Sequence, residues 1–140
     1  MSLVLDSSVA LAWCFEDERT QAVRVVLDAV VEGGAVVPSL WRYEVANGLQ
    51  MAIRRHRIDA AFRDRVLGNL SEFEIRADDD SDALVWPATT KLAGLYGLTV
   101  YDAAYLELAQ RRRLPLATLD AALTGAAQAA GVSLQIRLLR

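Results

Sequence analysis

Short apolar runs alternate along this chain with longer segments in which apolar residues recur about every three or four positions. The short runs are typical of strands buried on both faces of a parallel sheet, and the longer period is typical of amphipathic helices. The runs predict strands over residues 2–5, 35–37, 73–76, 114–118 and 133–136. The run at 73–76 alternates apolar with charged side chains, which favours an edge strand.

The segments between these runs carry helix signals. They predict helices over residues 8–13, from Asp17 or Thr20 to 31, 40–55, after Asp59, 84–95, 99–111 and 121–130. Asp59 can cap the helix that follows it, and Gly33-Gly34, Gly97 and Gly131 stand where helices should stop. Pro87 fits best in the first turn of the helix over 84–95.

Strands that alternate with helices favour a parallel α/β sheet with helices on both faces. No linker, repeat or low-complexity segment divides the sequence, so we expect one domain over residues 1–140. The predicted fold class is α/β, a single-domain three-layer α/β/α sandwich with a short, mainly parallel sheet.

The composition indicates the class of protein and the compartment in which we expect it. Hydrophobic residues make up 54% of the chain and charged residues 24%, which is a globular composition. The single cysteine, Cys14, fits a reducing compartment. No secretory signal is readable, and no apolar stretch approaches the roughly 20 residues that cross a bilayer. We therefore expect a soluble cytoplasmic protein with no membrane association.

The formal net charge of −3 does not suit a protein that grips nucleic acid through phosphates alone. Among the 15 basic residues only Lys91 is a lysine, and arginines cluster at 54–57 and 111–113. Arginine is suited to bidentate phosphate contacts, but solvated helix ends are the favoured interpretation of each cluster. The acidic run 78–80 is likewise predicted to be a solvated loop and helix start.

Four carboxylates are predicted to fall at one edge of the sheet. Asp6 ends the first strand, Asp120 follows the strand over 114–118, and Glu44 and Asp102 lie early in helices. In an open parallel sheet, ligands bind beyond the carboxyl ends of the strands. Each acid also has a structural explanation, because Asp6 and Asp120 are good N-cap residues and Glu44 and Asp102 suit a helix start. Helix caps alone have no reason to fall at one edge of the sheet, however, so the four acids together favour a ligand-binding site.

Several carboxylates in poor solvent repel one another unless a cation neutralises them. Oxygen ligands of this kind suit Mg²⁺ or Mn²⁺. A zinc site and a Ser-His-Asp or Cys-His site are disfavoured, because His56 is the only histidine, Cys14 is the only cysteine, and His56 stands among arginines. Of the kinds of site considered, the one that remains is a divalent-metal site that is formed by acids and acts on a phosphate.

Four stretches of the sequence resemble a known family. They are "LVLDSSVALAWCFEDE", "VVPSLWRYEVANGL", "GLTVYDAAYLELAQ" and "LPLATLDAAL" with "AAGV" after it. Their order and content resemble the PIN-domain ribonucleases, and specifically the VapC-type toxins of bacterial toxin–antitoxin pairs. The resemblance implies a PIN-like fold and metal-binding catalytic acids at Asp6, Glu44, Asp102 and Asp120. It also implies supporting roles for Ser8, Asn47 and Thr118.

The resemblance further implies an endoribonuclease that depends on Mg²⁺, or on Mn²⁺ in its place, with products that carry 5′-phosphate and 3′-hydroxyl ends. A cognate antitoxin, a homodimer and a toxin–antitoxin hetero-oligomer are the implied partners, beside the RNA substrate. Arginines near the site could supply phosphate contacts; the candidates are Arg42, Arg54, Arg112 and Arg113. From the residues alone, Glu44, Asn47 and Gly48 share one helix face, which favours a close approach at Gly48; the alternative is that Gly48 only relieves packing against a neighbouring helix.

Two alternatives stay open at this point. One is a housekeeping PIN-type nuclease that processes RNA. The other is a haloacid-dehalogenase-like phosphatase with Asp6 as nucleophile, since "LVLD" resembles its nucleophile strand. Such an enzyme needs a second aspartate two residues later, where this chain has Ser8, and a lysine, for which Lys91 is the sole candidate. A receiver-like signalling domain is disfavoured because it needs adjacent acids near the first strand.

Overall fold

A computed structural model of the chain describes residues 1–136 and contains a parallel sheet of four short strands. The strands are β1 (Leu3–Leu5), β2 (Ala35–Val37), β3 (Ile75–Ala77) and β4 (Leu116–Ala117). They are ordered β3-β2-β1-β4, and all three pairings are parallel. The predicted α/β class with a short parallel sheet is confirmed.

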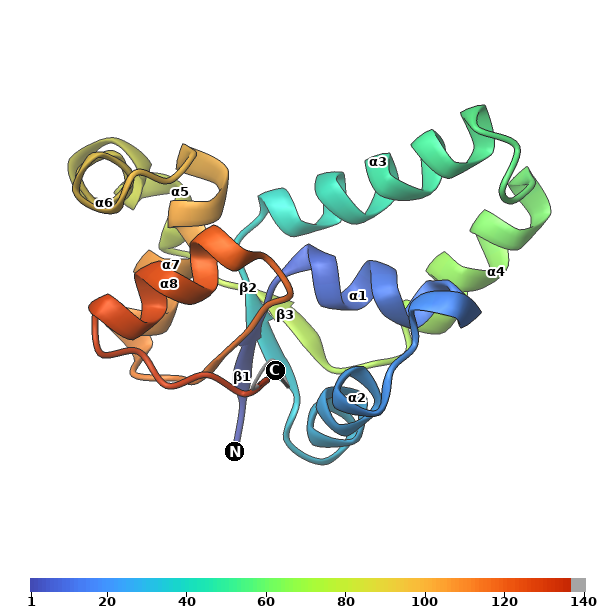
Figure 1. Cartoon of the computed structure of the whole chain (residues 1–140), viewed down its shortest axis with the longest axis horizontal. Helices are drawn as coiled ribbons and strands as arrows, with labels where there is room; N and C mark the ends of the chain where they lie inside the picture. The colour runs from blue at the N-terminus through green and yellow to red at the C-terminus, as the bar shows by residue number, and fades with distance from the viewer. Residues whose placement is uncertain (137–140) are drawn as a thin grey trace.

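Helices cover both faces of this sheet. They are α1 (Ser7–Cys14), α2 (Gln21–Gly33), α3 (Leu40–Arg54), α4 (Ala60–Leu70), α5 (Ser81–Leu84), α6 (Thr90–Tyr96), α7 (Val100–Arg112) and α8 (Ala121–Ala129), with a 3₁₀ turn η1 (Glu16–Glu18) and a π-helical segment η2 (Val85–Thr89). Figure 1 shows α1 and α2 on one side of the strands and α7 and α8 on the other. The helices α3 with α4, and α5 with α6, extend on either side above the carboxyl ends of the strands. No helix within residues 1–136 has the length and apolar character that a membrane span requires.

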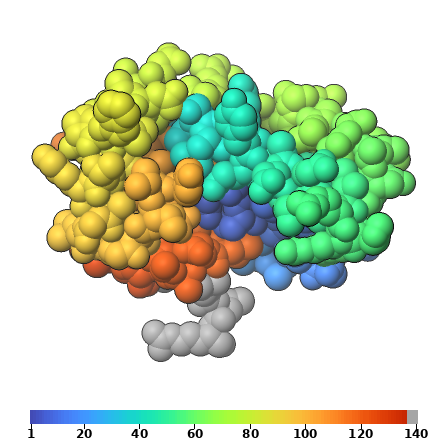
Figure 2. Space-filling model, turned by 90° about the horizontal axis from the view of Figure 1, so that it is seen from above, coloured from blue at the N-terminus to red at the C-terminus, as the bar shows by residue number. Residues whose placement is uncertain are grey.

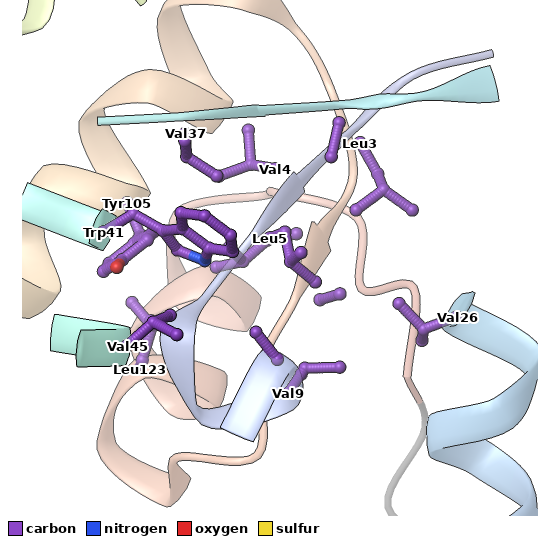
Figure 3. Packing of buried hydrophobic residues seen from close by; sticks show 14 of the residues in the cluster. Leu3, Val4, Leu5, Val9, Val26, Val37, Trp41, Val45, Tyr105 and Leu123 are labelled. Atoms are coloured by element: carbon purple, nitrogen blue, oxygen red, sulfur yellow. The ribbon is translucent and has the colours of Figure 1, made fainter. Parts of the chain in front are cut away.

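The buried core is centred on β1. Leu3, Val4 and Leu5 are at most 1% exposed, which agrees with a central strand covered on both faces. Figure 3 shows these residues among side chains of the surrounding helices, including Trp41 of α3 and Tyr105 of α7. The chain therefore holds the end of β1 in a rigid, water-poor environment.

Helix starts follow the capping signals in the sequence. Thr20 caps α2, Asp59 caps α4 and Thr99 caps α7; each side chain accepts a hydrogen bond from the backbone N–H three residues later. Asp120 caps α8 in the same way, since its Oδ2 accepts from the N–H of Leu123 at 2.8 Å. The sequence could predict these helix starts because a capping side chain and the N–H that it accepts from lie within one turn of the chain.

Two predicted elements are wrong in detail. Residues 84–95 do not form one helix, because Pro87 lies inside the π-helical η2 between α5 and α6. Proline has no N–H to donate and its ring crowds the preceding turn, which accounts for the widened turn at this position. The last predicted strand, 133–136, is reduced to a single bridge between Leu116 and Leu134.

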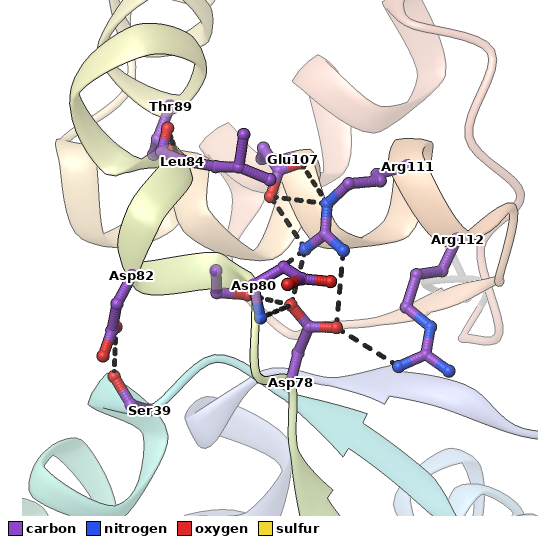
Figure 4. Close-up of polar contacts among 10 residues, drawn as sticks. Ser39, Asp78, Asp80, Asp82, Leu84, Thr89, Glu107, Arg111 and Arg112 are labelled. Atoms are coloured by element: carbon purple, nitrogen blue, oxygen red, sulfur yellow. Dashed lines mark hydrogen bonds and ion pairs between the residues drawn. The ribbon is translucent and has the colours of Figure 1, made fainter.

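The acidic run is a third correction, because Asp78 is buried and not solvated. Its Oδ2 accepts a hydrogen bond from Nη2 of Arg111 at 2.7 Å, and its Oδ1 accepts from Nη1 of Arg112 at 3.2 Å. Arg111 also pairs with Glu107 one helical turn earlier, and Ser81 donates to Asp78. Figure 4 shows this cluster, which fastens the end of β3 to the last turn of α7. Arg111 and Arg112 are therefore not simply solvated helix ends.

Opposing effects act on the Asp78 carboxyl group. Burial by itself raises its pKa, but the hydrogen bonds from Arg111, Ser81 and Arg112 and the charge of Arg111 lower the pKa to about 2. Asp78 is therefore ionised and neutralised by side chains of the chain itself.

Candidate functional site

The four acids singled out in the sequence come from separate elements that converge at one edge of the sheet. Asp6 directly follows β1, and Asp120 follows β4 after two intervening residues. Glu44 lies near the start of α3, which follows β2, and Asp102 lies in the first turn of α7. We call these four residues the acid rim. Because β2, β1 and β4 are adjacent and parallel, their carboxyl ends open on the same side.

A view from above looks onto this side of the molecule. In Figure 2 dark blue atoms from the beginning of the chain lie between the teal atoms of α3 and the orange atoms of later segments. Segments far apart in the sequence therefore lie side by side around the beginning of the chain on this face.

The electrostatics of the acid rim show that its members are neighbours. Burial is the main cause that raises the pKa of Asp6, and the charge of Asp120 raises it further. Burial also raises the pKa of Glu44, with added effects of Asp6 and Asp102. The pKa of Asp102 is raised by burial and then by Asp120 and Asp6. These acids therefore gather negative charge in a partly buried place, and within residues 1–136 none of them forms a salt bridge that would neutralise it.

Asp6 is held by two hydroxyl groups. Ser8 Oγ donates to its Oδ2 at 2.6 Å, and Thr118 Oγ1 donates to the same oxygen at 2.7 Å. The side chain is not an N-cap of α1, so the hypothesis that Asp6 also caps this helix is wrong. Its Oδ2 instead accepts from the hydroxyl of Ser8, in the first turn of α1, and from that of Thr118, which directly follows β4.

The same two hydroxyls tie Asp6 to the chain around Asp120. Ser8 Oγ accepts a hydrogen bond from the N–H of Leu119 at 3.0 Å, and Thr118 Oγ1 accepts from the N–H of Asp120 at 3.0 Å. Ser8 and Thr118, both predicted as supports, thus contact the acid rim. Asn47 lies exposed one turn after Glu44, and no hydrogen bond from it to the rim is found in the described part of the chain.

Glu44 is held by two further hydroxyls that the sequence did not point out as its partners. Ser7 Oγ donates to Oε1 of Glu44 at 3.2 Å, and the Tyr105 hydroxyl donates to the same oxygen. Burial and the Glu44 carboxylate raise the pKa of Tyr105 well above its usual range, so the hydroxyl keeps its proton and donates. A weak signal was available, because Tyr105 stands one helical turn after Asp102.

The close approach at Gly48 is a packing contact with a neighbouring helix, which is the structural alternative left open by the sequence. A Cβ atom at this position would lie 2.5 Å from Cδ1 of Leu11 in α1. The missing side chain lets α3 lie close against α1, and this contact brings Glu44 over the first turn of α1, where Ser7 is located.

The acid rim fits a hard divalent cation by the chemistry of its donors. Within residues 1–136, no three side chains of His, Cys, Asp or Glu converge tightly enough to enclose a metal ion by themselves. Mg²⁺ does not need such a cage, since it is usually held by one or two carboxylates together with waters and substrate phosphates. In Asp6 and in Glu44, both hydroxyl donors occupy one oxygen, and the second oxygen stays clear of side-chain donors among the described residues.

Comparison with known proteins identifies the family of this chain. The sequence profile of the PIN domain matches residues 3–128, which include all four acids. The chain belongs to the PIN-domain family.

Two further comparisons place this PIN domain among known relatives. It is 34% identical to the protein named Ribonuclease VapC3 from Pyrobaculum aerophilum over 120 residues, which cover 86% of this chain and 90% of the relative. Its fold is similar to the crystal structure of PAE2754 from Pyrobaculum aerophilum, with a TM-score of 0.66 and 26% identity over 90% of this chain and 84% of the other.

A second solved structure, FitAcB from Neisseria gonorrhoeae, supports the fold alone. Its TM-score is 0.66 at 20% identity, and the match covers 96% of each chain. The PIN domain described here is thus a homologue of a VapC ribonuclease with the three-layer α/β/α fold that the sequence predicted.

Proposed function

We propose that this PIN domain is a divalent-metal-dependent endoribonuclease that hydrolyses RNA phosphodiester bonds. Asp6, Glu44, Asp102 and Asp120 would hold Mg²⁺, or Mn²⁺ in its place. The observation that carries the proposal is that four acids from separate elements lie near one another on the side of the sheet where β2, β1 and β4 end. The homology to Ribonuclease VapC3 supports the same reaction.

Each part of the site has a task in this reaction. A bound divalent cation supplies charge neutralisation at the scissile phosphate and a water that loses its proton near neutral pH. The acids of the rim provide the negative oxygens that bind the cation. Ser8 and Thr118 hold Asp6, and Ser7 and Tyr105 hold Glu44, so that these carboxylates are oriented before the substrate arrives. The buried β1 beneath them limits movement of Asp6.

A cation held by the acids would supply positive charge for the RNA phosphate, so an acidic protein could bind RNA in this way. Arg42, Arg54 and Arg113 stay candidates for additional phosphate contacts. Arg112 is a weaker candidate, since it is paired with Asp78 in the folded chain.

The experiment compares cleavage of a structured RNA by the wild type and by isosteric variants of the rim. We expect cleavage with Mg²⁺ or Mn²⁺, none with EDTA, and a loss of at least about 100-fold in Asp6→Asn and Asp102→Asn, since even residues that support metal ligands are worth about 10- to 100-fold. Circular dichroism checks that both variants fold. Asp79→Asn, which changes an exposed aspartate outside the rim, is the matched control. Undiminished cleavage by the folded Asp6 and Asp102 variants would contradict the site.

We further propose that the enzyme is the toxin of a toxin–antitoxin pair, acting in the cytoplasm as a homodimer with a cognate antitoxin as partner. The motif resemblance and the VapC homology support this role. Induced expression of the wild type should arrest growth, Asp6→Asn should not, and a small protein encoded beside the gene should relieve the arrest. Normal growth with active enzyme would favour a housekeeping RNA-processing nuclease.

A further inference from the structure

Tyr105 combines complete burial with a contact to the acid rim. It is the largest of the fully buried side chains in the described part of the chain, with a relative exposure of 0%. A buried phenol needs a hydrogen-bond partner. Here the partner is the carboxylate of Glu44, which lies 61 positions away in the sequence and on a different helix.

The oxygen that receives this hydrogen bond is the second observation. The Tyr105 hydroxyl and Ser7 Oγ both donate to Oε1 of Glu44. Asp6 shows the same division, because Ser8 and Thr118 both donate to its Oδ2. In both acids the hydroxyls gather on one oxygen, and none of these four bonds involves the other oxygen.

The third observation concerns helix α7. Asp102 and Tyr105 are three residues apart on it, so they lie on the same face of the helix. One helix therefore contributes one acid of the rim directly and contacts a second acid, Glu44 of α3, through a hydroxyl.

From these contacts we infer that Tyr105 is a positioning residue of the rim: its hydroxyl holds Oε1 of Glu44 and thereby leaves Oε2 to bind a divalent cation. The inference rests on the proposed metal-dependent function. A hydroxyl is suited to this task because it orients a carboxylate without supplying a positive charge. The arginines on Asp78 do the opposite, since they orient the carboxylate and also neutralise it.

The test is the variant Tyr105→Phe, which removes one oxygen atom and keeps the buried ring. We expect it to bind Mn²⁺ about 10- to 100-fold more weakly in calorimetry, as is typical when the partner of a metal ligand is removed. RNA cleavage should fall by a similar factor at low Mn²⁺ and recover as Mn²⁺ is raised. Tyr96→Phe removes a hydroxyl from a partly buried tyrosine of α6 and is the matched control, with no change expected.

The outcomes separate the two proposals. Wild-type protein that neither binds Mn²⁺ nor cleaves RNA overturns both of them. Active wild type together with a folded Tyr105→Phe of unchanged Mn²⁺ affinity overturns the role of Tyr105 alone. A loss of cleavage that Mn²⁺ does not restore also contradicts it, because a defect in overall structure would produce that result.

A second variant keeps the test decisive if Tyr105→Phe does not fold. Ser7→Ala removes the other donor to Oε1 and should weaken Mn²⁺ binding in the same direction. Where both single variants fold, the double variant should lose less than the product of the two single effects, since both hydroxyls act on one oxygen. Independent, multiplicative effects would contradict a shared task.

Discussion

Asp6 and Asp78 occupy equivalent places in the fold but have opposite surroundings. Each aspartate directly follows a strand of the parallel sheet, β1 for Asp6 and β3 for Asp78, and both are buried, at 3% and 9% exposure. Asp6 has neutral hydroxyl partners and acidic neighbours, and its pKa is raised. Asp78 has two arginine partners, and its pKa is lowered to about 2.

The difference separates a buried aspartate whose charge is balanced within the chain from one that we propose to be a metal ligand. Arg111 and Arg112 supply the counter-charge of Asp78 within the chain, so the cluster is complete and fastens α7 to β3. The acid rim has no such partner among the described residues, and its charge can be balanced by a cation from outside. The end of a strand is therefore where both buried aspartates lie, and the charges of their neighbours determine whether each one is neutralised within the chain.

Removal of Asp78 should give the largest change in stability. Asp78→Ala leaves the guanidinium groups of Arg111 and Arg112 without this carboxylate. Loss of one partner from a buried ion pair costs about 3–5 kcal/mol. We expect about 2 kcal/mol here, because both arginines are partly exposed and Arg111 keeps Glu107. Urea unfolding measures the loss, and Asp79→Ala, at an exposed neighbour, should change stability by less than about 0.5 kcal/mol.

The matching change in the acid rim should have the opposite sign. Asp6→Asn removes a buried charge whose ionisation is opposed by burial and by Asp120, while the amide oxygen can still accept from Ser8 and Thr118. In EDTA at neutral pH we expect an unchanged or increased free energy of unfolding, by up to about 1 kcal/mol. A loss comparable to that of Asp78→Ala would show that Asp6 is needed for the fold itself.

The pH dependence of stability should separate the two regions, with a smaller effect. The lowered pKa of Asp78 means that its contribution is complete above the ordinary carboxyl range near about pH 4 and is lost as the pH falls toward about 2. The raised pKa values of Asp6, Glu44 and Asp102 act in the other direction. Their contribution is present at acidic pH and is lost as the pH rises through those raised values.

Metal-free protein should therefore be most stable at mildly acidic pH. Urea unfolding in EDTA from about pH 3 to about pH 8 measures this profile. Asp78→Ala should flatten the acidic side of the maximum, and Asp6→Asn should flatten the neutral side. A profile that rises steadily to neutral pH in the wild type would contradict the repulsion within the acid rim.

Much of the fold and the positions of the four acids could be predicted from local sequence. The short apolar runs predicted β1 and β2, and Thr20, Asp59 and Thr99 marked helix starts, because both partners of a cap lie within one turn. Asp6 and Asp120 were predicted at the same edge because the carboxyl ends of all strands in a parallel sheet lie at one edge. These features depend on the residues nearby in the chain.

Partners that lie far apart in sequence were decided only by the tertiary structure. Asp78 was predicted to be solvated because its arginine partners stand 33 and 34 residues later, on another helix. The hydrogen bond between Tyr105 and Glu44 was likewise not visible, and neither was the absence of a cap at Asp6. The sequence by itself determined most of the elements and the edge at which acids gather. The charge state and orientation of each acid depend on burial and on neighbours brought together by folding, and these exist only once the core around β1 has formed.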